Sequence, residues 1–179
     1  EAEAAKAREE QKIRSTYSVA VEHLRAEQDA LRKAAIVQMR GYLDKYPKAP
    51  DAPDVMYRLA DLYIDESDGA FQSEYAAFEQ LMTQIGDRPD LELPEEPKRD
   101  LSLALNLYQR IITEYPDSSF VPLAMSNMAY YLDTPNTKQY NREDARDISL
   151  AIVQRFPNTV FSDEANMRLG EYYFEQVGP

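Results

Sequence analysis

Three pairs of an aromatic residue followed by proline divide the sequence, with the aromatic residues at Tyr46, Tyr115 and Phe156. Counted back from each proline, apolar residues recur at offsets near −12, −9, −8, −5, −4 and −1. The residues at offset −12 are Ala35, Ala104 and Ala145. Apolar side chains spaced three and four residues apart form one face of an α-helix. Because the residue before a proline is disfavoured in the α-helical region, each helix is predicted to end at its aromatic residue.

A second apolar stripe follows each proline. Its members are Val55, Leu59 and Ala60 in the first copy, Ala124, Met128 and Ala129 in the second, and Ala165, Leu169 and Gly170 in the third. Residues of the kind that cap helix N-termini stand between the stripes, Asp51 and Asp54 among them, and Pro122 falls just inside a predicted helix start. Each copy therefore predicts a helix, a short turn and a second helix. The small residue at the end of every stripe predicts a close approach of helices there.

Residues 1–40 contain neither proline nor glycine and are rich in strong helix formers. They predict one long helix whose first turns project or fray. In part of this helix, mainly apolar residues recur at intervals of three and four residues. These residues are Tyr17, Val21, Leu24, Gln28, Leu31 and Ala35. Two interpretations of residues 1–28 remain open: a solvated, charged helix end, or a coiled-coil contact with a partner.

The first and second copies are separated by additional residues, Glu66 to Arg99. Apolar residues from Phe71 to Ile85 are spaced as one amphipathic helix, with Gly86 as its C-cap. Either a degenerate repeat that lost its second helix or a helix-plus-loop insertion at 66–97 fits this pattern, and the insertion is favoured. Its irregular acidic part, 87–97, is a candidate recognition element or a tolerated excursion.

Between the second and third copies lies a longer loop, 133–138. Asn141 follows it and is predicted to be the N-cap of the next helix, with Asp144 three residues later.

Composition excludes several kinds of chemistry. The chain has no cysteine, one histidine (His23) and five widely spaced glycines. Disulfides, thiolate sites, a His-rich metal centre and a phosphate-binding glycine loop are therefore excluded. The net charge of −12 argues against general affinity for nucleic acid. No apolar run approaches the roughly 18 residues of a membrane span, no signal peptide is recognised, and both termini are taken as edges of an excised piece.

The helix pairs resemble tetratricopeptide (TPR) repeats, because alanine, a large and a small residue, and the aromatic helix ends stand at fixed positions. The turn is similar to that of bacterial envelope TPR proteins, such as the lipoprotein of the outer-membrane β-barrel assembly machinery and the periplasmic coordinator of envelope constriction. The absence of Trp, the missing closing proline and the uneven spacing of the copies depart from the family pattern.

The resemblance implies an all-α protein, a right-handed α-solenoid of TPR-like helix pairs with a long N-terminal helix and one helix-plus-loop insertion. The expected parts are an N-terminal extension, 1–28, and a solenoid, 29–179, with repeats at about 30–65, 98–133 and 141–176 and the insertion at 66–97.

The resemblance further implies a non-enzymatic scaffold without cofactors or metals that binds a peptide or helix of another protein on its concave face. A periplasmic or outer-membrane location is expected, with the cytoplasm as the alternative. The implied groove residues are Arg32, Ile36, Met39, Arg40, Leu101, Leu105, Tyr108, Gln109, Arg142, Arg146, Ser149 and Leu150. The four arginines, with no acidic residue, favour an acidic or carboxylate-terminated segment as the partner.

An alternative interpretation is that Met39 and Tyr108 complete the core and that the arginines pair with nearby carboxylates such as Glu143 or Asp147. Two further function classes compete with the scaffold: an oligomerisation module acting through the N-terminal helix, and a helical lytic enzyme using two carboxylates. The enzyme is disfavoured, because most acidic pairs lie in loops or at helix starts. The third copy ends without a polar capping helix, so further repeats or an oligomer contact are expected at that end.

Overall fold

The protein is described by a computed structural model that covers residues 2–86, 88 and 93–177, with the backbone alone for residues 2–10, 13 and 177. Most of these residues are helical. The helices are α1 (Ala2–Lys45), α2 (Ala52–Ile85), α3 (Ser102–Glu114), α4 (Val121–Leu132), α5 (Arg142–Arg155) and α6 (Val160–Val177). No strand forms in the described part of the chain, where an isolated parallel bridge joins Arg99 and Thr137. The predicted all-α class is confirmed.

The chain divides into two compact units, Glu1–Gly41 and Tyr42–Pro179. The long N-terminal helix predicted for residues 1–40 is confirmed, since α1 continues without a break through Gly41 to Lys45. An added Cβ at Gly41 would meet no atom within 4 Å, so glycine is not needed here to let another part of the chain pack closely. The division into units follows Gly41, whereas the sequence predicted a domain boundary after residue 28.

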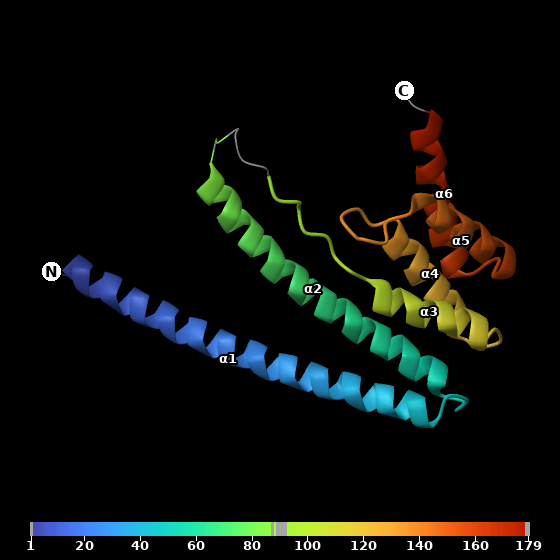
Figure 1. The fold of residues 1–179 in the computed structure, drawn as a ribbon, viewed down its shortest axis with the longest axis horizontal. Helices are drawn as coiled ribbons and strands as arrows, with labels where there is room; N and C mark the ends of the chain where they lie inside the picture. Colours follow the sequence, from blue (N-terminus) through green and yellow to red (C-terminus); the bar gives the residue numbers. More distant parts are fainter. Residues whose placement is uncertain (1, 87, 89–92, 178–179) are drawn as a thin grey trace. The chain divides into compact units, whose positions relative to one another are not determined.

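α2 runs as one helix from the first copy through most of the predicted insertion (Figure 1). No proline interrupts it after its first turn, and the weak helix formers Ser67 and Gly69 are tolerated. It ends at Gly86, whose φ of +56° favours glycine and whose N–H donates to the carbonyl of Met82 at 3.0 Å. The C-cap prediction is therefore confirmed, but the separate inserted helix is corrected: it prolongs the helix that starts at Ala52. The predicted loop 87–97 lies partly outside the described residues.

The aromatic residues before proline close their helices as predicted. The N–H groups of Tyr115 and Phe156 donate to the carbonyls of Ile111 and Ile152, which ends α3 and α5. These bonds satisfy carbonyls of the last turn, and the following proline prevents continuation. The sequence alone was sufficient here because the stop signal is local.

Helix starts follow the predictions less uniformly. Asn141 caps α5, since its side-chain oxygen accepts from the N–H of Asp144 at 3.2 Å. Asp51 makes no side-chain cap for α2 and instead accepts a hydrogen bond from the hydroxyl of Tyr42 at 2.6 Å. Pro122 lies in the first turn of α4, where its missing N–H has no intrahelical partner to lose.

In the second unit, each helix from α2 to α6 packs on the next one along the chain (Figure 1). Equivalent alanines of the two later copies, Ala104 with Ala145 and Ala124 with Ala165, are all buried. Gly170 is different: it is exposed, and an added Cβ would meet no atom within 4 Å. The predicted close approach is wrong at Gly170, because no helix follows α6 within the described residues.

The loop between α4 and α5 fixes the start of α3. The N–H of Arg99 donates to the carbonyl of Asn136 at 3.0 Å, and the N–H of Lys138 donates to the carbonyl of Arg99 at 2.8 Å. The N–H of Leu101 donates to the side chain of Gln139, also at 2.8 Å. The longer loop therefore supplies backbone partners to an irregular segment that would otherwise have to find them in water.

Candidate partner-binding surfaces

Four of the predicted groove residues lie in the interior of the second unit. Leu101, just before α3, and Leu105 and Tyr108 of α3 are buried. Ser149 of α5 is also buried, and its hydroxyl donates to a carbonyl of its own helix at 2.8 Å. The reason is that α3 is covered on two sides, by α2 and by α4. The more accessible members of the predicted set on these two helices, apart from the arginines, are Gln109 and Leu150.

Tyr108 belongs to a polar cluster inside the stack. Its hydroxyl donates to Asp61 at 3.3 Å, and the side-chain amide of Asn127 donates to the hydroxyls of Tyr57 at 2.9 Å and Tyr108 at 3.2 Å. Burial raises the pKa of Tyr108 far above its usual value, and it also raises the pKa of the Asp61 carboxyl, although Asp61 as a whole is exposed. Tyr108 therefore keeps its proton and ties α2, α3 and α4 together. The core interpretation of Tyr108 is supported.

Arg142 and Arg146 of α5 already have partners within the protein. Arg142 donates to Asp133 at 2.9 Å and also pairs with a carboxylate of α6. Arg146 pairs with Asp147 at 2.7 Å, as the alternative interpretation predicted. Both guanidinium groups lie over the ring of Tyr172, at 5.6 and 5.3 Å from its centroid. An acidic ligand would have to compete with all these contacts.

The other predicted groove residues lie in α1, within the unit Glu1–Gly41. They are Arg32, Ile36, Met39 and Arg40. Arg32 forms an ion pair with Asp29 one turn earlier in the same helix. Their role in binding stays a prediction.

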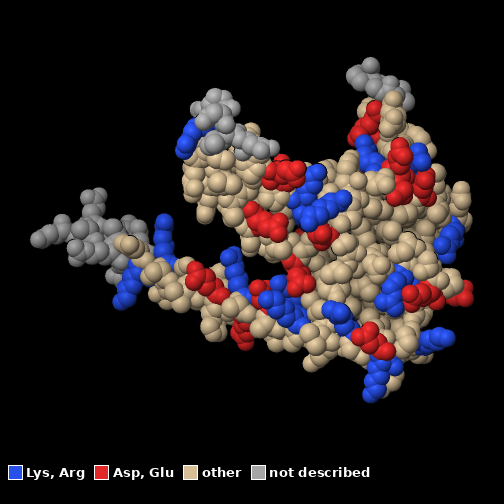
Figure 2. All heavy atoms as spheres, viewed as in Figure 1, with Lys and Arg blue, Asp and Glu red and all other residues tan. Residues whose placement is uncertain are grey.

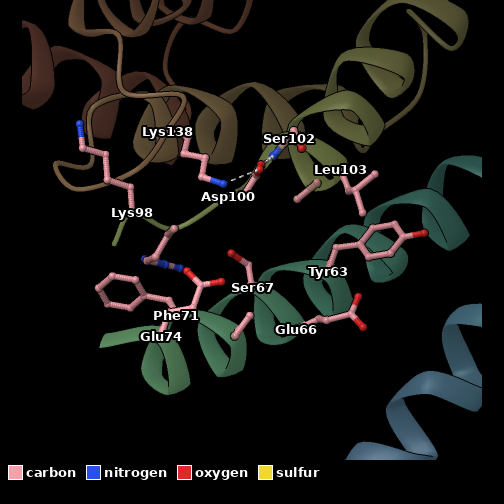
Figure 3. A pocket seen from close by; sticks show the side chains of 13 residues that line it. Tyr63, Glu66, Ser67, Phe71, Glu74, Lys98, Asp100, Ser102, Leu103 and Lys138 are labelled. Carbon is pink, nitrogen blue, oxygen red and sulfur yellow. Dashed lines mark hydrogen bonds and ion pairs between the residues drawn. The ribbon is translucent and has the colours of Figure 1, made fainter. Parts of the chain in front are cut away.

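A hollow of about 250 Å³ opens between α2 and the residues that lead into α3 (Figure 3). Asp100 at its edge accepts hydrogen bonds from the N–H of Ser102 at 3.1 Å and from the side chains of Gln139 at 2.9 Å and Lys138 at 3.3 Å. The bonds from Ser102 are the main reason why the pKa of Asp100 falls to about 2. Lys138 and Asp100 therefore serve mainly to hold the start of α3.

The rest of this hollow carries both signs of charge. Glu66 and Glu74 of α2 line one side, with the ring of Phe71 on the same helix (Figure 3). Lys98 and Arg99 line the other side. A balanced lining of this kind gives no preference for a ligand of one charge.

A larger hollow, about 630 Å³, lies between α4 and α6, and we call it the α4–α6 groove. Its lining residues are Ser126, Asn127, Tyr130, Asp133, Thr134, Pro135, Glu164, Met167, Arg168 and Glu171. Two of them offer apolar surface, Tyr130 with 56% and Met167 with 65% of its surface exposed. Phe174, 82% exposed, lies seven residues after Met167 and so on the same face of α6. An exposed apolar patch at a groove is a common mark of a protein-binding site.

The charge of the α4–α6 groove is mainly negative. Asp133, Glu164 and Glu171 line it together with one cation, Arg168. Asp133 forms an ion pair with an arginine of α5, and Glu164 accepts a hydrogen bond from the hydroxyl of Ser126 at 3.1 Å. Within the described part of the chain, neither Glu164 nor Glu171 forms an ion pair, so both carboxylates are open to a cation.

The negative charge does not by itself distinguish the groove, because the whole chain carries a net charge of −12. Figure 2 shows acidic and basic side chains interspersed over the face that it draws. The site is therefore defined by the combination of shape, apolar side chains and open carboxylates rather than by a large charged surface.

Comparison with known proteins finds no relative: no family model, no curated protein and no solved structure matches the chain. Among the described residues, no group of three or more His, Cys, Asp or Glu side chains is arranged so that it could hold a metal ion. A search of the same residues finds no helix with the length and hydropathy that crossing a membrane requires.

The α4–α6 groove was not predicted from the sequence, although one signal was present. Val160, Met167 and Phe174 stand seven residues apart, which places apolar side chains on one face of α6. They lie outside the buried stripe that contains Ala165 and Leu169. The comparison of the three copies considered only that stripe. An apolar row beside the packing stripe of an amphipathic helix indicates a second contact surface.

Proposed function

We propose that this protein is a non-enzymatic protein–protein interaction scaffold that holds a basic, amphipathic segment of a partner in the α4–α6 groove. In this proposal α3 with α4 and α5 with α6 are TPR-like helix pairs of a short α-solenoid. The buried alanines at equivalent positions and the aromatic–proline ends of α3 and α5 support this arrangement. Membership of a bacterial cell-envelope complex, which the family resemblance implies, belongs to the same proposal.

One observation carries the proposal: exposed Met167 and Tyr130 stand beside the open carboxylates of Glu164 and Glu171 in a single groove. A helix with apolar residues on one face would cover the thioether and the ring, and would remove that surface from water. Lysine or arginine residues flanking that face would pair with the two carboxylates. Helical segments that dock by an apolar face are a recurring mode of recognition.

The arginine row of α5 is a weaker candidate for the same function. Arg142 and Arg146 are satisfied by carboxylates and by Tyr172, so an incoming carboxylate would replace contacts rather than add them. Glu171 of the α4–α6 groove has no such internal partner within the described residues. Binding there gains an interaction without losing one.

The proposal is tested with two synthetic peptides of the same helical pattern, one of Lys and Leu and one of Glu and Leu. Fluorescence anisotropy at physiological salt should show binding of the Lys peptide. Replacing both carboxylates, by Glu164→Gln with Glu171→Gln, should weaken binding about fivefold, since each exposed ion pair contributes about 0.2–1 kcal/mol.

The matched control is Glu143→Gln with Asp147→Asn, which removes the same charge from α5 and leaves the α4–α6 groove intact. It should change the affinity less than about twofold. Equal losses in the two double variants would show binding to net charge alone, and tighter binding of the Glu peptide would contradict the proposed groove.

A further inference from the structure

One face of α1 carries a coiled-coil register. Tyr17, Val21, Leu24 and Leu31 follow one another at steps of four, three and seven residues. All four side chains are exposed, and Leu24 has 62% of its surface open to solvent. A row of apolar side chains at this spacing forms the seam by which two helices wind around each other.

The same heptad register also gives the positions of the polar residues in this segment. With Val21 at position a and Leu24 at position d, Gln28 occupies the next a position. Glu27 then falls at g and Arg32 at e, five residues later. In a parallel pair of helices, a g residue of one helix faces the e residue five positions further along the other helix.

We propose that α1 pairs with α1 of a second copy of this chain as a parallel, in-register, two-stranded coiled coil over residues 17–35. The apolar row meets its own equivalent, and Gln28 meets Gln28 of the second copy, where the two amides can hydrogen-bond to each other. Glu27 of each chain lies opposite Arg32 of the other, giving two complementary charge pairs. The Arg32 side chain, now 15% exposed, turns outward to reach Glu27 of the second copy and leaves its present partner Asp29.

The charges argue for a parallel rather than an antiparallel pair. An antiparallel arrangement brings e residues opposite e residues, and here those are Arg25 and Arg32. It also sets Gln28 against an apolar d residue, which leaves the buried amide without a partner. The same sequence therefore favours one orientation and one register.

This inference concerns residues 17–35 and is independent of the α4–α6 groove. Dimer formation would present two grooves on one assembly, so a partner with two basic segments would bind with higher avidity.

The test uses single cysteines in the full chain, which contains none of its own. Leu24→Cys and Leu31→Cys place a thiol at d positions, where equivalent residues meet across the seam. Val19→Cys is the control, because Val19 is as exposed as Leu24, at 66%, but lies at position f on the outer face. Under mild oxidation both d variants should form disulfide-linked dimers at least tenfold faster than the f variant.

Light scattering of the unmodified chain should show the mass of two chains at high concentration, falling toward 20.6 kDa on dilution. Glu27→Lys should weaken the dimer about tenfold, and adding Arg32→Glu should restore it. A monomer at every concentration, or equal linking at all three positions, overturns the proposal. Linking at only one of the two d positions overturns the parallel register.

Discussion

At the scale of single residues, the interior of the second unit is held by a few polar contacts as well as by apolar packing. Tyr108 is fully buried, yet its hydroxyl has both an acceptor in Asp61 and a donor in Asn127. A buried hydroxyl with its partners in place is stabilising, whereas one without them would cost free energy. This is why a tyrosine can occupy the centre of the stack.

Replacing Tyr108 by phenylalanine should lower the free energy of unfolding by about 1–2 kcal/mol, because Asn127 and Asp61 lose a hydrogen-bond partner while the ring remains. Urea unfolding followed by circular dichroism measures the change. Tyr130→Phe is the control, since this hydroxyl is on the surface, and it should change stability by less than about 0.5 kcal/mol. Equal effects of the two substitutions would show that the buried cluster contributes nothing.

Asp100 should make the free energy of unfolding depend on pH. Its pKa in the folded protein is about 2, mainly because of the hydrogen bonds from Ser102, and lies below the unfolded value near 4. A depressed pKa stabilises the folded state above the unfolded pKa, and the contribution is lost as the pH falls through the folded pKa. Because Asp100 is exposed, solvent screening limits this contribution to about 1 kcal/mol.

Asp100→Asn removes the charge and keeps a hydrogen-bond acceptor. The variant should therefore be less stable than the original protein at pH 6, and most of this difference should be lost by about pH 2, the folded pKa. Unfolding curves recorded at both values measure this, and a difference that does not shrink on acidification would contradict the assigned pKa.

At the scale of elements, the ends of a helix can be predicted from a few neighbouring residues. The length of a helix cannot, because it also depends on packing. The stops at Tyr115 and Phe156 and the cap at Asn141 were predictable, because each depends on two or three neighbouring residues. The continuity of α2 was missed, because the first copy was taken to end near residue 65; Ser67 and Gly69 follow that point without breaking the helix. Such residues weaken a helix by less than the packing of its apolar face stabilises it.

The glycines of α2 should respond to alanine in opposite directions. Gly86→Ala should lower stability by about 1–2 kcal/mol, because its φ of +56° and ψ of −149° lie in a region that L residues avoid. Gly69→Ala should raise stability by up to about 1 kcal/mol, because Gly69 is within the helix and an added Cβ meets nothing within 4 Å. Thermal unfolding of both variants checks this, and the same sign in both would refute the assigned backbone.

At the scale of the whole second unit, successive helices stack, so the degree of coverage differs between them. α3 has neighbours on both sides, whereas α6 packs on α5 and touches α4. The exposed Met167 and Phe174 and the open Gly170 are consequences of this position. A helix at the end of a stack opens locally at lower free energy than one in the middle.

Hydrogen exchange followed by mass spectrometry should therefore find the amides of α6 at least tenfold less protected than those of α3. Adding the Lys–Leu peptide should raise protection in α6 and leave α3 unchanged. Equal protection of the two helices in the free protein would contradict the unequal coverage.

The candidate site was less predictable than the fold, for a physical reason. Spacing identifies the faces of a helix but not which neighbour covers them, so Tyr108 could be assigned to a groove although it is buried. Arg146 was equally uncertain, because the sequence could not choose between Asp147 and a ligand as its partner. The α4–α6 groove depends on helices that are distant in sequence, and only the packed structure brings Ser126 to Glu164.

Methyl NMR of the methionines, recorded while the Lys–Leu peptide is added, tests most directly whether the partner binds in the α4–α6 groove. The signal of Met167, in the α4–α6 groove, should shift in proportion to binding. The signals of Met39, a member of the sequence-predicted groove, and of the buried Met56 should stay in place. A shift of Met39 with Met167 unchanged would place the partner elsewhere and contradict the account.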